Sequence, residues 1–244
     1  MRTAASAACL VLGTGLVAGA LAAHALAGDP PEPSPYERGR SLWHSVPVDR
    51  LFPPALHGDA AGPGGADRDW RRLGVAPDTG CAGAFDPALA RALAPAGCTR
   101  LLRATYTDAT ATTVTTVGLL VTGTGPAGMR ALRDRFDDGH LDRRTDLMPH
   151  PYAPPGTLAA RFGDAQRASW RVTVLTDAPA VVYTVTGFAD ARTDTPPQPA
   201  SDALLPGAAS AVAQAGLAHD ATALADRLER TLREALRATP EQTP

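Results

Sequence analysis

Alternating hydrophobic and polar positions predict four β-strands, which follow one another as two hairpins. The segments 99–108 and 113–122 are rich in Thr, Val and Leu, and the short connection between them favours a hairpin. The segments 169–176 and 181–188 repeat this arrangement around a second turn. Because side chains alternate between the faces of a strand, one face of the segment 113–122 is predicted to be apolar. That face is formed by Val117, Leu119 and Val121.

A hydrophobic period near that of the α-helix predicts two helices beside the first hairpin. A short helix begins at Asp86, which can cap it, and ends before Gly97. A second helix follows Gly125 and ends near Gly139. Its apolar side is predicted to carry Met129, Leu132 and Phe136.

The longest predicted helix covers residues 220–238 and begins with Asp220 as its N-cap. Its apolar stripe consists of leucines four residues apart, at Leu224, Leu228 and Leu232. Two i,i+4 ion pairs are expected on its exposed face, each worth about 0.2–0.5 kcal/mol. These pairs are Asp226–Arg230 and Glu229–Arg233.

The order helix, hairpin, helix, hairpin, helix predicts an α+β fold. We expect a two-layer domain in which an antiparallel sheet of two hairpins has helices packed on one face. This domain is expected to cover residues 41–238, with a short tail at 239–244. Within it, residues 41–80 and 140–167 are broken by Pro and Gly and are predicted to be irregular.

The first 27 residues form an apolar segment that is predicted to be a signal peptide or a transmembrane anchor. No acidic or basic residue occurs between Thr3 and Ala27, and Arg2 precedes this stretch. An A-x-A cleavage pattern ends at Ala27, while the length of the stretch approaches that of a membrane span. A buried cytosolic helix is the alternative. In the first two cases the positive-inside rule places the rest of the chain outside the cytoplasm, either anchored to the membrane or secreted, and the Pro-rich residues 28–40 would be a linker.

Export would place two cysteines in an oxidising environment. Cys81 and Cys98 are the only cysteines outside the apolar segment, and we expect a structural disulfide between them. Metal ligation and a redox pair are the alternatives, although a redox pair usually has C-x-x-C spacing.

The charge balance argues against nucleic-acid binding. The chain has 23 basic and 25 acidic residues, a net charge of −2 and no long basic block. All the basic residues are Arg, and the chain contains no Lys, Asn or Ile. Because the codons of these three residues are AT-rich, we infer a GC-rich genome such as that of an actinobacterium.

A glycine pattern resembles a dinucleotide-binding turn but lacks the surroundings of one. Gly123, Gly125 and Gly128 have the G-x-G-x-x-G spacing. However, the preceding strand is predicted to pair in a hairpin, and Pro126 removes a backbone N–H that a phosphate would need. We therefore expect no cofactor, and we interpret the glycines as a turn before a helix.

Known catalytic patterns are missing from the sequence. The histidines are His24, His44, His57, His140, His150 and His219. No two of them have the i,i+4 spacing of a helical zinc motif, and no nucleophile elbow or S-x-x-K pair occurs. We predict no catalytic residue and no metal ligand. The alternative is a hydrolytic or metal site built from His140, Asp142, Asp146 and His150, which lie in one irregular segment.

One stretch resembles a known kind of extracellular domain. The segment 81-CAGAFDPALARALAPAGCTRLLRATYTD-108 combines spaced cysteines, a helix and the start of a hairpin. With the apolar segment and Pro-rich linker before it, the chain looks like actinobacterial extracytoplasmic proteins of unassigned function. More distantly, residues 40–190 resemble the extracellular sensor domains of mycobacterial PknH-type kinases. This chain has one such cysteine pair where two bridges would be expected in that family.

The resemblance implies a binding or sensing role at the cell envelope. Our leading hypothesis is a non-enzymatic extracytoplasmic domain that binds a protein partner or a small ligand, and contacts the membrane through its first 27 residues if these are not cleaved. The alternatives are a secreted hydrolase whose site is assembled from scattered residues, and a structural accessory subunit of a membrane complex.

Overall fold

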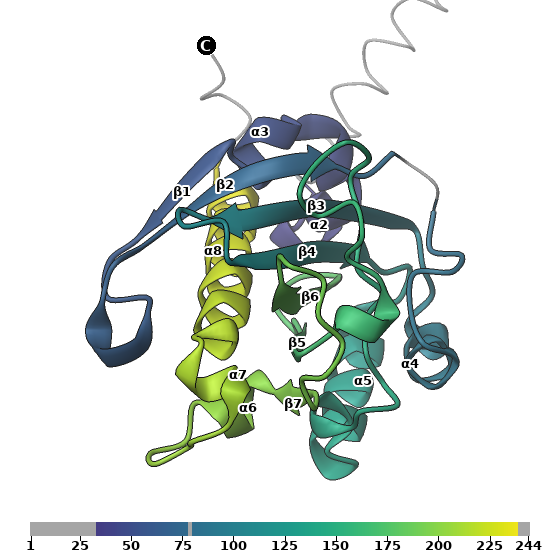
Figure 1. Cartoon of the computed structure of the whole chain (residues 1–244). Coiled ribbons are helices and arrows are strands. Elements are labelled where there is room, and N and C mark those ends of the chain that lie inside the picture. Colours follow the sequence, from purple (N-terminus) through teal and green to yellow (C-terminus); the bar gives the residue numbers. More distant parts are fainter. Residues whose placement is uncertain (1–32, 78–79, 239–244) are drawn as a thin grey trace, which may run out of the picture. The chain divides into compact units, whose positions relative to one another are not determined.

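The computed structural model describes residues 33–77 and 80–238, which contain a seven-stranded sheet surrounded by helices (Figure 1). The helices are α2 (Pro35–Ser45), α3 (Val48–Leu51), α4 (Pro87–Leu93), α5 (Pro126–Asp138), α6 (Ala200–Ala203), α7 (Ala211–Gln214) and α8 (Leu217–Arg237). The strands are β1 (Ala55–Gly58), β2 (Arg68–Val75), β3 (Arg100–Asp108), β4 (Thr113–Val121), β5 (Ser169–Val174), β6 (Ala180–Phe188) and β7 (Gln198–Pro199). The predicted membrane segment, the linker up to residue 32 and the tail lie outside the described residues.

Both predicted hairpins form and lie side by side at the centre of the sheet. The strand order is β1-β2-β3-β4-β6-β5-β7, and every pair is antiparallel except β5 with β7. Strand β4 joins the two hairpins, because it pairs with β3 on one side and with β6 on the other. The α+β class and the antiparallel sheet are therefore confirmed.

The sheet extends further than the two hairpins, and this extension was not predicted. The prediction that residues 41–80 are irregular is wrong, because β1 and β2 form an antiparallel pair there and β2 continues onto β3. Strand β2 reads RDWRRLGV, and only Trp70 within it is buried, so the strand lacks the apolar alternation that would reveal it. Helix α2 also begins at Pro35, within the predicted linker.

Helices pack against both faces of the sheet, so the structure adds a second helical layer to the single one expected. On one face, α2, α3 and α8 contribute to a core that includes Leu119, Val182 and Leu228. On the other face, α4 and α5 pack with Tyr183 and Trp170. Every residue of β4 is buried, as expected of a strand covered on both faces.

Cys81 and Cys98 form a disulfide, as predicted, with their Cα atoms 6.4 Å apart. The bond connects the segment before α4 to the segment that enters β3. No helix within residues 33–77 and 80–238 combines the length and apolar character needed to cross a bilayer.

Asp220 is a buried charge that joins α8 to the sheet, and it is not the helix cap that the sequence predicts. Helix α8 begins at Leu217, so Asp220 lies inside its first turn. Its side chain is fully buried, and it accepts hydrogen bonds from Arg68 Nη2 at 2.6 Å, Trp70 Nε1 at 3.0 Å and Thr113 Oγ1 at 2.7 Å. Burial raises the pKa of the Asp220 carboxyl, and the Arg68 guanidinium opposes that shift. The network links α8 to β2 and β4.

We expect Asp220→Ala to lower the free energy of unfolding by about 3–5 kcal/mol, because it leaves the Arg68 charge without its carboxylate. Urea unfolding followed by circular dichroism measures this change. The control is Asp177→Ala, which breaks the exposed ion pair with Arg233 and should cost about 0–1 kcal/mol. An Asp220→Ala protein as stable as this control would contradict the assignment.

Candidate ligand-binding cleft

A cleft of about 430 Å³ lies between the β1–β2 hairpin and helix α8. We call it the β1–α8 cleft. Its apolar lining includes Leu56, Trp70 and Leu224. Its ionisable lining consists of His57, Asp59, His219, Asp226, Arg227 and Arg230. Trp70 also donates to buried Asp220, so the network beneath the cleft holds one of its walls in place.

His57 lies at the rim, between two carboxylates. Its Nδ1 atom is 2.7 Å from Asp69 Oδ1 and its Nε2 atom is 3.1 Å from Asp59 Oδ1. Because a carboxylate only accepts, both ring nitrogens must donate for both bonds to form, and this requires the charged imidazolium. Hydrogen bonding to Asp69 and Asp59 accordingly raises the pKa of His57.

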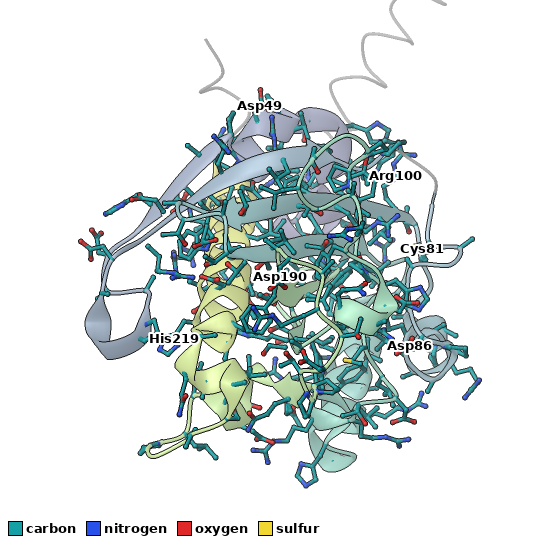
Figure 2. All side chains as sticks on the ribbon, viewed as in Figure 1. Asp49, Cys81, Asp86, Arg100, Asp190 and His219 are labelled. Carbon is teal, nitrogen blue, oxygen red and sulfur yellow. A yellow bond between two sulfur atoms is a disulfide. The ribbon has the colours of Figure 1, made fainter. Side chains whose placement is uncertain are left out.

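His219 lies in the first turn of α8 (Figure 2). Its electrostatic environment is opposite to that of His57. Its Nδ1 atom is buried and has no hydrogen-bond partner in the described part of the chain. Burial lowers the pKa of His219, against the opposing effect of the neighbouring Asp220 charge. The cleft therefore contains one histidine that favours the charged form and one that favours the neutral form.

Arg227 and Arg230 are exposed cations of the cleft that bind no carboxylate among the described residues. The predicted Asp226–Arg230 pair is wrong, because Asp226 binds Arg171 of β5 at 2.6 Å instead. The predicted Glu229–Arg233 pair does form, at 3.3 Å. Within residues 33–77 and 80–238, neither Arg227 nor Arg230 has an ion-pair partner. Two guanidinium groups, three residues apart on one helix, thus line a concave surface without internal neutralisation.

This arrangement favours an anionic ligand. A guanidinium presents parallel N–H donors that match a carboxylate or a phosphate bidentately. The apolar lining can cover a hydrocarbon part of the ligand.

A cation is a weaker fit to the same hairpin. His57, Asp59 and Asp67 have ligand atoms within 4.8 Å of one another, and all three residues are exposed. A metal would have to displace a proton from His57, which hydrogen-bonds to Asp59 and Asp69 through its two nitrogens. The geometry therefore favours a hydrogen-bonded imidazolium over a metal ligand. The sequence alone does not reveal this group, because the antiparallel β1–β2 hairpin brings Asp67 back to His57 and Asp59.

The residues named for the alternative hydrolytic or metal site do not converge. His150 Nε2 lies 3.0 Å from Asp86 Oδ1, and His150 Nδ1 lies 3.1 Å from the Gly83 carbonyl oxygen. The backbone carbonyl of Asp142 accepts the Trp170 indole N–H at 2.9 Å. Asp146 binds Arg144 at 2.6 Å, and His140 occupies a left-handed backbone conformation just after α5. No hydrogen bond links these four residues to one another in the described part of the chain.

The glycine turn begins a helix, as the sequence indicates. Gly125 precedes α5 in extended backbone, and Pro126 is the first helical residue. Both neighbours of β4 are antiparallel to it. The turn therefore does not belong to the parallel strand–helix–strand unit of a dinucleotide-binding fold.

Comparisons with protein-family models, with curated proteins and with solved structures find no match to this chain. The structure shows an α+β domain with a cleft between β1 and α8 that is lined by Arg227 and Arg230. Its function has to be argued from that cleft.

We expect the two cleft histidines to titrate on opposite sides of the usual histidine value of about 6.5, with His57 above it and His219 below it. Carbon-13 or nitrogen-15 NMR titration of the ring signals measures both. Asp69→Asn should lower the pKa of His57, because it removes the carboxylate that stabilises the imidazolium.

Asp67→Asn is the matched control for this titration, since Asp67 accepts from the Ala60 backbone N–H and has no hydrogen bond to His57. If the pKa of His57 falls equally in both variants, the overall negative charge of the β1–β2 hairpin, and not the contact with Asp69, raises that pKa.

Proposed function

We propose that this protein is a non-enzymatic extracytoplasmic binding domain whose ligand carries an anionic group held in the β1–α8 cleft. The observation that carries the proposal is the pair of guanidinium groups, Arg227 and Arg230, that line the cleft without a carboxylate partner in the described residues. Some exposed arginines of this protein bind a carboxylate, as in Arg144–Asp146 and Arg192–Asp190. Arg227 and Arg230 differ from these arginines, because they line a cavity and their charges remain available to a ligand.

The surroundings of the cleft suit binding better than catalysis. Beneath it, the Asp220 network fixes Trp70, so the cleft is backed by a rigid wall. A hydrolase would need a nucleophile or activated water beside a base and a stabilising donor. His219 lies on the cleft, but its buried Nδ1 has no hydrogen-bonded carboxylate to orient the ring among the described residues.

The extracytoplasmic location is part of the proposal and has two supports. The predicted signal peptide or anchor at residues 1–27 is one. The Cys81–Cys98 disulfide is the other, because such bonds persist mainly in oxidising compartments. The resemblance to actinobacterial envelope proteins and PknH-type sensor domains fits a binding or sensing role on that side of the membrane.

We expect a double variant, Arg227→Gln with Arg230→Gln, to bind anions at least about tenfold more weakly than the wild type, which corresponds to about 1.4 kcal/mol. The probes are phosphate, pyrophosphate, glutarate and citrate, titrated while backbone amide NMR shifts are followed. The affinity of the wild-type protein for these anions should fall as the salt concentration rises, because salt screens the attraction between the anion and the two arginines.

Arg233→Gln is the matched control, because Arg233 is on the same helix and already binds Asp177 and Glu229. It should bind the anions as the wild type does. The absence of saturable shifts at the cleft with every probe would exclude the proposed anion site.

We expect Cys81 and Cys98 to be protected from thiol alkylation in intact cells that express the full chain, and to become alkylated only after reduction. Mass spectrometry of the labelled peptides measures this. A Cys81→Ser variant should expose Cys98 to labelling without reduction. If the wild-type protein is alkylated at both cysteines before reduction, the proposed location is wrong.

A further inference from the structure

A second cavity, of about 340 Å³, adjoins the β1–α8 cleft along the edge of the sheet. Its lining includes residues 170–174 of β5 and Arg133 of α5. Leu204 of the segment after α6 and Thr222 of α8 line this cavity and also line the β1–α8 cleft. The two cavities therefore meet at Leu204 and Thr222.

Strand β5 is an open edge over most of its length. Strand β7 pairs with β5 only at Ser169 and Trp170. Further along, the Val174 carbonyl accepts a hydrogen bond from Arg133 Nη1 at 2.7 Å, so this carbonyl points away from β6. By the period of two, the backbone N–H and carbonyl of Val172 point in the same direction. Among the described residues, Val172 has no hydrogen-bond partner on that side.

Arg133 occupies a position where the N–H of a further strand could lie. Its side chain is 44% exposed, and it also binds Asp137 in the next turn of α5 at 3.1 Å. A long charged side chain that covers a sheet edge is a common protection against unwanted strand pairing. Because the Arg133 side chain is long and partly exposed, another rotamer can move it aside when another donor approaches Val174.

The distance between the open edge and the free arginines is short. Arg171 of β5 reaches Asp226 of α8 at 2.6 Å, and Asp226 directly precedes Arg227 in the helix. The Arg171–Asp226 ion pair therefore lies between the β5 edge and Arg227. An extended chain advances about 3.3 Å per residue. A few residues of peptide would cross from β5 to Arg227. Leu204, which is 37% exposed at the junction, offers an apolar contact on the way.

We propose that the β5 edge and the β1–α8 cleft form one groove, and that its occupant is an extended peptide that carries an acidic residue. The peptide backbone adds to the sheet beside Val172, and its carboxylate binds Arg227 and Arg230. An extended chain is the ligand that supplies alternating N–H and carbonyl groups to a sheet edge. The acidic residue of the peptide supplies a carboxylate partner for Arg227 and Arg230. This inference rests on the proposed anion site and names the class of ligand that the site takes.

The test is fluorescence anisotropy with a labelled octapeptide of alternating Thr and Val that ends in two Glu residues, together with its reverse sequence. We expect one of the two orientations to bind the wild-type protein. A peptide with Gln in place of Glu should bind at least about tenfold more weakly, and so should the Glu peptide with N-methyl groups on alternate Val residues. The N-methylated peptide keeps its charge but cannot donate to the sheet edge.

Arg133→Ala is the most discriminating variant. Strand addition at β5 and purely electrostatic attraction predict opposite changes in peptide affinity for it. Removal of the side chain that covers Val174 should tighten binding of the unmethylated Glu peptide severalfold and leave the N-methylated peptide unchanged. A merely electrostatic surface would bind the peptide less well after losing a positive charge. Arg233→Gln serves as the control for general changes of charge on α8.

The outcomes separate this inference from the proposed function. If small anions bind at the cleft but the methylated and unmethylated peptides bind equally or not at all, the peptide inference is overturned and the anion site stands. If neither anions nor peptides bind, both are overturned. Sedimentation could instead show a concentration-dependent dimer that the peptide does not dissociate and that Arg133→Ala strengthens. This result would assign the β5 edge to a second copy of the chain and would also overturn the peptide inference.

Discussion

The buried carboxylate of Asp220 is the interaction on which the rest of the domain depends. A fully buried charge is costly unless it is paired and hydrogen-bonded, and Asp220 receives donors from Arg68, Trp70 and Thr113. These donors come from β2 and β4, whereas Asp220 belongs to α8. Hydrophobic packing alone would hold α8 against the sheet with little preference for a particular register. The directional hydrogen bonds select one register, and that register positions the β1–α8 cleft.

The electrostatics of the cleft follow from this placement. With α8 held beside β5, Asp226 reaches Arg171 and no longer neutralises Arg230. The same placement brings His219 to the cleft with its Nδ1 atom buried, while His57 is held at the rim by Asp59 and Asp69. The placement of α8 thus leaves Arg227 and Arg230 without a carboxylate partner among the described residues, and the proposed function uses their charges.

Local pattern predicted the central elements because their apolar and β-branched residues are dense or regularly spaced along the chain. Strands β4 and β6 are rich in Val and Thr and are buried on both faces, and the spacing of Leu224, Leu228 and Leu232 in α8 matches the face that the helix buries. The pattern failed at the edge of the sheet. Strand β2, next to the edge strand β1, carries arginines at exposed and half-exposed positions, so its pairing is visible only through the backbone hydrogen bonds to β1 and β3.

The candidate site was less predictable than the fold. All of its residues are visible in the sequence, and His57 and His219 are among the six histidines considered there. Their proximity is not visible, because β1 and α8 are separated by most of the chain. The sequence also indicates a favourable Asp226–Arg230 pair by helical spacing, but that local interaction competes with a non-local one to Arg171, which the structure forms.

The sequence by itself determined which segments form the two central hairpins, α4, α5 and α8, and which two cysteines pair. These features depend on local periodicity, or on there being a single pair of cysteines outside the apolar segment. Only the tertiary structure decided the partners of Asp220, the lack of a carboxylate partner for Arg227 and Arg230 among the described residues, and the unpaired outer side of β5 beyond Trp170. Each of these depends on distances between groups far apart in the chain, and periodicity specifies which face a side chain occupies but not which distant group meets it there.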